Sequence, residues 1–413
     1  MKGRSAATDP ILVLSPEAPY PVAGGGALRT ASFLEYFAAR GRVHLILFAV
    51  EGDSDPRERL PDGLVERADL VRLPRHGSDF LSRCGRNAGR LLRRRPPLFD
   101  RFSQPESLEA VAKITANRRY SLALVEHFWC AGYLSLIREA AAWSVLNLHN
   151  VESALHSACA RSEPFPQNWA HGRFARQALS LEKELLAGYD SIVTTSAVDS
   201  ERVRAIAPDA KVAVVPNAIP LRDPVAGEER EVVAFSGNLE YHPNVSAVKF
   251  FAARIWPQLR MKFPNLVWRL IGKNEAAFRP LAASDPRIEL TGPVDDAVAE
   301  LASARVVVAP LLAGSGTRVK ILEAWAASRA VVSSPIGAEG LPFTEETHLL
   351  LAESPDRWLK QVSRVLEDQI LRNRLGANGR SAYETHCSWP AAWRALDAAL
   401  APRFPSVGAE TTV

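Results

Sequence analysis

The sequence predicts an α/β protein made of two Rossmann-like domains that face each other across a cleft. Three observations support this fold class. The chain has 413 residues, which is more than a single hydrophobic core normally holds. Short apolar runs alternate with helical patterns in both halves, which is typical of a mainly parallel sheet with helices on both faces. Between the halves lies a polar segment with several prolines and glycines, the composition of a domain linker.

The first domain is expected to span residues 1–218, and the linker residues 219–231. Seven apolar runs are candidate strands of its sheet, over residues 11–14, 43–50, 70–73, 122–125, 144–148, 192–195 and 212–215. Ligands of such a sheet bind beyond the carboxyl ends of its strands. Residues that directly follow a strand are therefore the first candidates for a functional site.

The second domain is expected to span residues 232–386. Its six candidate strands cover residues 232–236, 266–271, 288–290, 306–309, 330–332 and 349–351. Helical patterns predict helices over residues 245–261, 356–375 and 391–400. We expect the segment 387–413, which includes the last of these helices, to pack back toward the first domain.

The stretch 306–341 predicts a βαβ unit whose helix starts near Thr317. Gly314, Ser315 and Gly316 precede this start and let the backbone turn closely. The free N–H groups and the positive dipole end of such a helix form an anion site.

Charged residues follow in the same helix. Arg318 and Lys320 add positive charge beside the expected anion site. Glu323 lies two turns along the helix, on roughly the same side as Gly316. A ligand with phosphate at one end and hydroxyl groups at the other would use both ends of this arrangement, which indicates a nucleotide.

A second glycine-rich loop follows the first candidate strand. Gly24, Gly25 and Gly26 precede a helix expected over residues 27–39, and Arg29 adds a positive charge near its start. A dinucleotide fingerprint would need glycine or alanine at position 29 and a tighter turn after the strand, so it is excluded. The loop is either a flexible connection or a second anion-binding helix start, and the charge of Arg29 favours the second interpretation.

His149 directly follows the candidate strand 144–148, where catalytic groups of such folds point. A single histidine is usually structural, so its position alone carries the hypothesis of a catalytic role. His127 is a weaker candidate by the same logic. Asn150 and Glu152 fit a turn and a helix start.

Positive charge is concentrated between Arg72 and Arg119. That segment has twelve basic and four acidic residues, whereas the whole chain has a net charge of only +4. Within it, apolar and basic residues alternate at helical spacing over residues 80–95. These residues form either a core-packing helix with a solvated face or a surface that attaches to an anionic membrane. Gly85 and Gly89 weaken the helix itself. No nucleic-acid partner is expected.

The four cysteines lack the spacing of a zinc site or of a disulfide framework. We expect free and mostly buried thiols. The N-terminus has no apolar core of a signal peptide, and no apolar run is long enough to span a membrane. These features predict a cytoplasmic protein.

Several motifs occur in the order known from one enzyme family. In the second domain they are residues 235–239 with 243–245, 270–274, 290–294 and, above all, 309–341. In this half the chain resembles the family-4 retaining glycosyltransferases, which have the GT-B fold. The resemblance is looser in the first domain, where it depends on the loop at Gly24 to Gly26, on His149 with Asn150, and on residues 215–217. It covers most of the chain.

The resemblance implies that the chain binds a nucleotide-diphospho-sugar. Glu323 would bond the ribose hydroxyl groups, and Gly316 and Thr317 would offer N–H groups to the diphosphate. Arg318 and Lys320 would neutralise the leaving diphosphate, where fixed cations help most as charge develops.

The resemblance also implies that His149 would approach the donor sugar. It assigns further positions to the donor site. The family's donor-site positions fall on Gly237, Asn238, Gly272, Lys273, Pro293, Val294 and Ser315. On the acceptor side, Gly25, Gly26 and Arg29 would form a phosphate-contacting loop. Ser315 departs from the family, which often has glutamate there. A serine cannot supply a carboxylate to the transferred sugar, so we expect a changed binding mode and not an inactive enzyme.

The resemblance implies sugar transfer with retention of anomeric configuration. The acceptor would be a cell-surface polysaccharide, a lipid-linked molecule or a small molecule. No cofactor and no metal are implied, because helix dipoles and cations can stabilise a diphosphate and Asp295-Asp296 looks like a helix start and not a metal-binding pair. The alternatives are a sugar-nucleotide epimerase of the same fold and a non-catalytic regulator that binds nucleotide-sugars. A solute-binding protein is disfavoured by the missing export signal.

Overall fold

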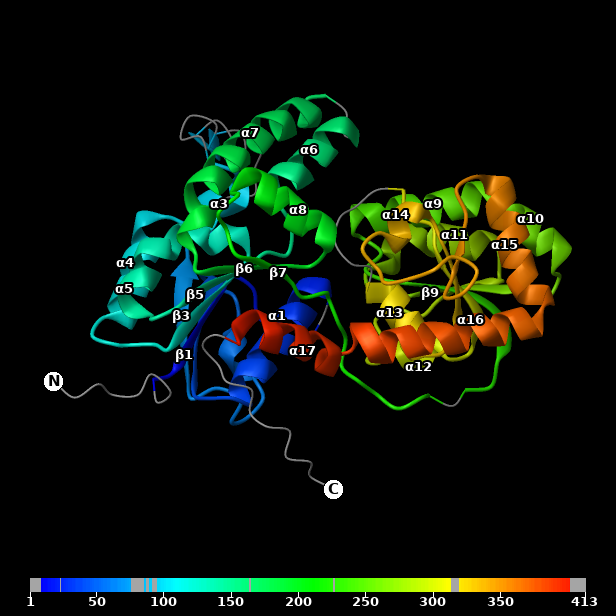
Figure 1. Cartoon of the computed structure of the whole chain (residues 1–413). Coiled ribbons are helices and arrows are strands. Elements are labelled where there is room, and N and C mark those ends of the chain that lie inside the picture. The colour runs from blue at the N-terminus through cyan, green and yellow to red at the C-terminus, as the bar shows by residue number, and fades with distance from the viewer. Residues whose placement is uncertain are drawn as a thin grey trace, which may run out of the picture. The chain divides into compact units, whose positions relative to one another are not determined.

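The computed structural model describes residues 9–22, 24–75, 85–86, 89–90, 95–162, 165–225, 227–312 and 319–401 (Figure 1). The chain divides into two units. Unit 1 combines Met1–Pro216 with Trp393–Val413, and unit 2 is Asn217–Ala392. Each unit contains one parallel sheet with helices on both faces, so the predicted α/β class with two Rossmann-like domains is confirmed.

Unit 1 contains a seven-stranded sheet in the order β3-β2-β1-β4-β5-β6-β7. Its strands are β1 (Ile11–Ser15), β2 (Val43–Val50), β3 (Arg67–Leu73), β4 (Leu122–Glu126), β5 (Ser144–Asn147), β6 (Ser191–Thr194) and β7 (Val212–Val214). Every one overlaps a predicted run. β3 begins three residues earlier than its run because an edge strand tolerates polar residues such as Arg67 and Asp69 on its less covered face.

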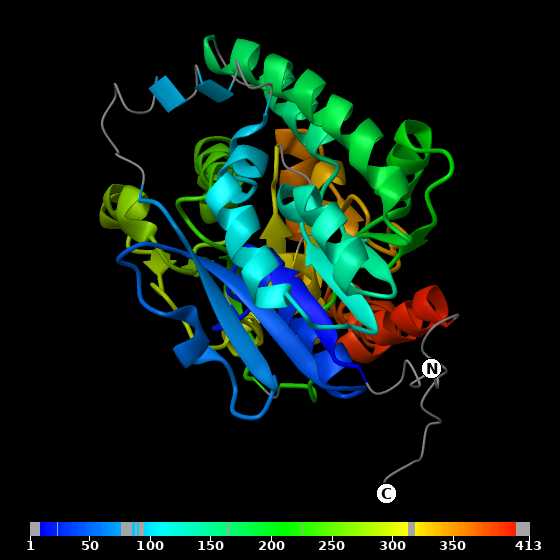
Figure 2. The ribbon, with the colours of Figure 1, turned by 90° about the vertical axis from the view of Figure 1, so that its left-hand side faces the viewer.

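Helices cover both faces of this sheet. They are α1 (Gly25–Ala38), α3 (Pro97–Phe102), α4 (Pro105–Thr115), α5 (Leu134–Ala140), α6 (Glu152–Ser162), α7 (Gln167–Leu185) and α8 (Ala197–Ile206), with 3-10 helices η2 (Pro56–Arg59), η3 (Phe128–Tyr133) and η4 (Leu186–Gly188). In Figure 1, α4 and α5 lie on one side and α1 on the other. Seen from the side of unit 1, α7 runs along the edge of this unit (Figure 2).

The last helix is α17 (Trp389–Leu400), and its second half, from Trp393, belongs to unit 1. Trp393 Nε1 donates to the carbonyl oxygen of Ser32 at 3.1 Å. Asp397 Oδ1 accepts hydrogen bonds from Tyr36 and Arg40 at 2.8 and 2.9 Å. These contacts fix α17 against α1.

Unit 2 contains a six-stranded sheet in the order β10-β9-β8-β11-β12-β13. The strands are β8 (Arg230–Ser236), β9 (Val267–Ile271), β10 (Ile288–Leu290), β11 (Ala304–Ala309), β12 (Ala330–Ser333) and β13 (Leu350–Leu351). The helices are α9 (His242–Arg254), α10 (Trp256–Lys262), α11 (Arg279–Ser284), α12 (Ala297–Leu301), α13 (Val319–Ala326), α14 (Pro335–Ala338), α15 (Pro355–Glu367) and α16 (Gln369–Ala382), with η5 (Glu275–Phe278) and the π-helix η6 (Tyr383–Cys387).

Two long helices predicted for unit 2 are each divided in the structure. The helix predicted over residues 245–261 consists of α9 and α10, because Pro257 has no N–H to continue the hydrogen bonding of α9. The helix predicted over 356–375 consists of α15 and α16. Asp368 separates them in an extended conformation, and its side chain caps α16 by accepting from the N–H of Leu371 at 2.9 Å.

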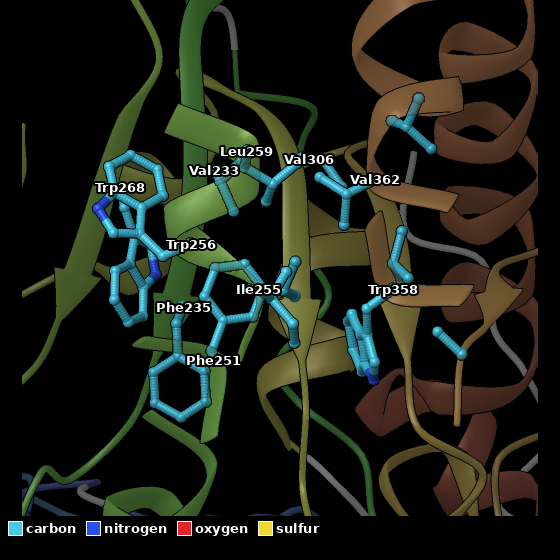
Figure 3. Close-up of a cluster of buried hydrophobic side chains, with 14 of the residues drawn as sticks. Val233, Phe235, Phe251, Ile255, Trp256, Leu259, Trp268, Val306, Trp358 and Val362 are labelled. Atoms are coloured by element: carbon cyan, nitrogen blue, oxygen red, sulfur yellow. The ribbon is translucent and has the colours of Figure 1, made fainter. Parts of the chain in front are cut away.

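The core of unit 2 is rich in tryptophan (Figure 3). Trp268 on β9 packs between Phe251 of α9 and Trp256 of α10, with ring centroids 4.9 and 5.7 Å apart. Trp358 of α15 meets the same Phe251 edge to face. Deleting one such buried ring typically costs about 3–5 kcal/mol. This packing fixes the strands whose carboxyl ends carry the candidate site.

The basic segment 80–95 lies mostly outside the described residues. Gly85, Arg86, Gly89 and Arg90 are helical. Arg90 turns toward the protein and forms an ion pair with the buried Asp100, with Nε and Oδ2 3.5 Å apart. Arg90 therefore does not belong to a solvated basic face as predicted. In the described part of the chain, no helix is long and apolar enough to cross a membrane.

Candidate functional site

Three loops at the carboxyl ends of β8, β9 and β10 pack closely through glycine. Gly237 N donates to Ile271 O at 2.9 Å, and Gly272 N donates to Gly292 O at 3.2 Å. A side chain at Gly272 would place its Cβ only 2.1 Å from Gly237 O, and both residues have positive φ angles of 138° and 145°. Only glycine fits this close approach of the two loops.

Lys320 of α13 reaches the end of β8. Its Nζ donates to Asn244 Oδ1 at 2.8 Å and lies 3.9 Å from the centre of the Phe235 ring. The residue is only 8% exposed. A Cβ on Gly237 would lie 3.1 Å from this Nζ, so the glycine makes room for the ammonium group. The positive charge is thus held in one place by an amide and an aromatic ring.

Glu323 lies one turn further along α13, on the same face of the helix as Lys320. Its Oε2 accepts a hydrogen bond from Ser236, the last residue of β8, at 3.1 Å. Burial raises the pKa of Glu323, while the bond from Ser236 and the charge of Lys320 act in the opposite direction. An ammonium group and a carboxyl group therefore lie together at one strand end.

The other predicted residues of unit 2 that the structure describes follow the carboxyl ends of β8, β9 and β10. Asn238 is exposed, and its Oδ1 accepts a hydrogen bond from Asn274 Nδ2 at 3.0 Å. The exposed Lys273 contributes its backbone oxygen to Leu239 N at 3.0 Å. In the segment after β10, Pro293 is exposed and Val294 is half-buried. Ser315, Gly316, Thr317 and Arg318 lie outside the described residues.

Asp296 is the N-cap of α12, as predicted for Asp295-Asp296. Its Oδ1 accepts from the N–H groups of Val298 and Ala299 at 3.0 and 3.1 Å. Arg222 forms a two-pronged ion pair with the same carboxylate, at 2.5 and 2.7 Å. Within the described residues, no group of three or more His, Cys, Asp or Glu is arranged to hold a metal ion.

In unit 1, His149 is buried at the carboxyl end of the sheet beside the carboxyl group of Glu126. Its Nε2 lies 2.7 Å from Glu126 Oε2. Asn147 Nδ2 donates to both oxygens of Glu126, at 3.1 and 2.9 Å. Burial lowers the pKa of His149 well below its ordinary value, and the positive charge of Arg29 acts in the same direction. The lowered pKa favours the neutral imidazole form of His149.

The guanidinium group of Arg29 does not lie at the helix start, where the sequence predicted an anion site. The residue is buried, and its Nε and Nη2 donate to Asn147 Oδ1 at 2.9 and 2.7 Å, while Nη1 donates to Val215 O at 2.8 Å. Burial lowers its pKa to about 10. The guanidinium group thus supports Asn147 from inside the unit and does not extend toward a phosphate at the helix start.

The glycine-rich loop leads into α1, which begins at Gly25 after Gly24 with φ 95°. A Cβ on Gly26 would lie 2.8 Å from Glu17 Oε2. Burial raises the pKa of Glu17, and the nearby Glu126 raises it further. A carboxyl group therefore already lies beside the helix start where an anion was predicted.

His127 belongs to the same cluster and stacks on His149 with ring centroids 3.6 Å apart. Its other face stacks on Trp129 at 4.2 Å. Trp129 Nε1 in turn donates to Glu152 Oε1 at 2.9 Å. Burial lowers the pKa of His127 well below its ordinary value. The structure thus brings together both histidines that the sequence singled out.

Glu152 gives a prediction about stability and pH. Burial raises its pKa from 4.5 to about 7. The folded state therefore holds a proton that the unfolded state loses near pH 4.5, and the contribution of Glu152 to the stability of the wild type falls as pH rises from 4.5 through 7. Replacing Glu152 by Gln keeps the acceptor for Trp129 and removes this titration.

The free energy of unfolding of Glu152→Gln should therefore rise relative to wild type by about 2–3 kcal/mol between pH 5 and pH 8. Urea denaturation at the two pH values measures the change. The exposed Glu184→Gln on α7 is the matched control. If the free energy of unfolding of Glu152→Gln differs from that of wild type by the same amount at both pH values, Glu152 is not a buried, protonated carboxyl group.

Comparisons with known proteins agree with this architecture. Sucrose-phosphate synthase from Thermosynechococcus elongatus superposes with a TM-score of 0.70 at 17% identity, over 96% of this chain and 98% of that one. Anabaena HepE in complex with UDP-glucose gives 0.63 at 14% identity, over 95% and 99%. The chain has the GT-B fold.

The sequence of this GT-B chain is also similar to known sequences. Residues 230–368 match the family described as Glycosyl transferases group 1. A Klebsiella pneumoniae protein described as an uncharacterized 44.6 kDa protein in the cps region is 21% identical over 368 residues, covering 85% of this chain and 89% of that protein. The matched family segment contains every described candidate residue of unit 2, from Gly237 to Glu323.

Sequence patterns missed several partners in the two clusters of this GT-B chain, among them Asn147 at the end of β5. Glu126 and Ser236 are the last residues of β4 and β8, so the rule that pointed to His149 also applied to them. Asn244 lies in the first turn of α9, and its only signal was its place in the motif 243–245.

Proposed function

We propose that the protein is a retaining glycosyltransferase that moves a sugar from a nucleotide-diphospho-sugar to an acceptor. The observation that carries the proposal is the pair Lys320 and Glu323 at the carboxyl end of β8, within the segment that matches the glycosyl transferases group 1 family. The pair offers one fixed cation and one carboxyl group at the place where α/β folds bind ligands.

Each member of the pair suits a different part of a nucleotide-sugar. A carboxylate can accept hydrogen bonds from both ribose hydroxyl groups. The Lys320 ammonium group, held by Asn244 and Phe235, would lie near the diphosphate, whose charge grows as the sugar leaves. A cation that is already in position stabilises such a transition state without reorganisation. Transfer would then need no metal ion, so EDTA should leave the rate unchanged.

UDP-sugars are the first donors to test, because Anabaena HepE has been solved with UDP and with UDP-glucose. The first experiment is a thermal-shift screen against UDP-, GDP-, ADP- and dTDP-sugars. A ligand at 100 times its dissociation constant adds about 2.7 kcal/mol to the free energy of unfolding. No shift with any nucleotide or nucleotide-sugar would contradict the proposal.

The products then separate transfer from its alternatives. With the donor that binds, a panel of saccharide and lipid-linked acceptors should yield a glycoside whose anomeric configuration equals that of the donor, as read by proton NMR. Conversion of the donor without acceptor into another nucleotide-sugar would instead indicate an epimerase. Binding without conversion across the whole acceptor panel would indicate a regulator that senses nucleotide-sugars.

A further inference from the structure

The longest helix that the structure describes in unit 1, α7, has one exposed basic face. Its exposed residues Trp169, Arg173, Arg176, Ser180 and Lys183 are spaced by three or four positions. That spacing places them in one stripe along the helix. Among the described residues, neither Arg173 nor Arg176 pairs with a carboxylate. Of the two glutamates on α7, Glu182 is buried and Glu184 lies in the last turn, far from Trp169.

Aromatic side chains stand at the tip of the hairpin that α6 and α7 form. Phe165, just before α7, is 79% exposed, and Trp169 in the first turn is 55% exposed. The guanidinium group of Arg173 lies 6.0 Å from the centre of the Trp169 ring, and the exposed Arg161 lies in the last turn of α6. Figure 2 shows α7 along the edge of unit 1.

The opposite face of α7 holds the hairpin in place. Phe174 and Ala178 are buried there, and Glu182 accepts a hydrogen bond from Ser153 N of α6 at 3.1 Å. Between the two helices, His156 Nδ1 and His171 Nδ1 are 2.9 Å apart. The fold is therefore maintained by the inner face, and the exposed aromatic and basic residues are not needed for it.

We propose that this face, defined by Arg161, Phe165, Trp169, Arg173, Arg176 and Lys183, docks onto an anionic lipid bilayer. Exposed Phe and Trp at the tip can enter the interfacial region of a bilayer, where aromatic rings are favoured. The arginines and the lysine complement the negative charge of lipid headgroups. The surface is distinct from residues 80–95, and the inference does not depend on the proposed sugar transfer.

The test is sedimentation of the full chain with vesicles of phosphatidylcholine alone or with 30% phosphatidylglycerol. Wild type should bind the anionic vesicles and release them in 0.5 M NaCl, because salt screens the basic stripe. Arg173→Ala with Arg176→Ala should lower the partition coefficient about 30-fold, which corresponds to about 1 kcal/mol for each lost charge. Phe165→Ser with Trp169→Ser should lower it at least about tenfold through lost apolar contact.

Matched controls lie on unit 2. Lys249→Ala with Lys360→Ala removes two exposed charges, and Met261→Ser with Ile370→Ser removes two side chains that are 80% and 83% exposed. Both controls should bind vesicles like wild type, and all variants should keep the wild-type melting temperature. The proposal is overturned if wild type does not bind anionic vesicles, or if hairpin and control variants behave alike. A dimer that the Phe165/Trp169 variant dissociates, without vesicle binding, would assign the face to a second copy of the chain.

Discussion

Replacing Glu323 by alanine or Lys320 by methionine is expected to weaken sugar transfer by about two orders of magnitude or more while the protein stays folded. Losing the Glu323 carboxylate removes charge-assisted hydrogen bonds of about 1.5–3 kcal/mol each, so the dissociation constant of the donor should rise by about two orders of magnitude or more. Losing the Lys320 charge should lower kcat by about 10²–10³ at saturating donor. Methionine keeps the apolar stem over the Phe235 ring. Isothermal titration with the donor and initial rates separate the two effects.

The control for this pair is Lys249→Ala, which removes an exposed lysine from α9. Its affinity and rate should equal those of wild type. The melting temperatures of all three variants should stay close to that of the parent, because under the proposed function Lys320 and Glu323 bind the donor and are not part of the apolar core. Near-normal turnover in both Glu323→Ala and Lys320→Met would contradict the assignment of the donor site.

Replacing Gly272 by alanine is expected to destabilise unit 2 strongly. Alanine at φ 138° costs about 1–3 kcal/mol by itself, and its Cβ would lie 2.1 Å from Gly237 O. The two loops would have to separate, which brings the expected total to about 3 kcal/mol or more. For a unit of this size that lowers the melting temperature by about 6–12 °C. Calorimetry measures it directly.

The same substitution at Gly292 distinguishes crowding from backbone strain. Gly292 also has a positive φ, 71°, but no atom lies within 4 Å of an added Cβ. Gly292→Ala should therefore cost only about 1–2 kcal/mol. If the two alanine variants melt at the same temperature, the close approach of Gly272 to Gly237 does not contribute to stability.

Hydrophobic patterns predicted the strands well because a parallel strand covered on both faces is an unbroken apolar run. The run over residues 43–50, for example, has the same bounds as β2. Helix ends were less well predicted. The apolar helical pattern continues without a break past Pro257 and past Asp368. The reason is that the helices on both sides of each residue, α9 with α10 and α15 with α16, bury an apolar face.

The candidate site was predictable where residues are close in sequence and not where the fold joins distant ones. Lys320 and Glu323 occupy neighbouring positions of one helix, so spacing alone placed them together. Arg29 and Asn147 are 118 residues apart, and no periodicity indicates such a pair. The charge of Arg29 near a helix start therefore suggested an anion site, whereas its guanidinium group bonds Asn147 in the interior of unit 1.

The membership of α17 in unit 1 has a consequence for synthesis. Unit 1 begins at the N-terminus, yet the helix that contacts Ser32, Tyr36 and Arg40 comes from the end of the chain. Domains usually fold in the order in which they leave the ribosome. Here the 217–392 segment can finish first, and at 5–20 residues per second the surface of α1 that receives α17 stays uncovered for roughly 10–35 s longer. During translation, the half of the protein that is made first is the half that is completed last.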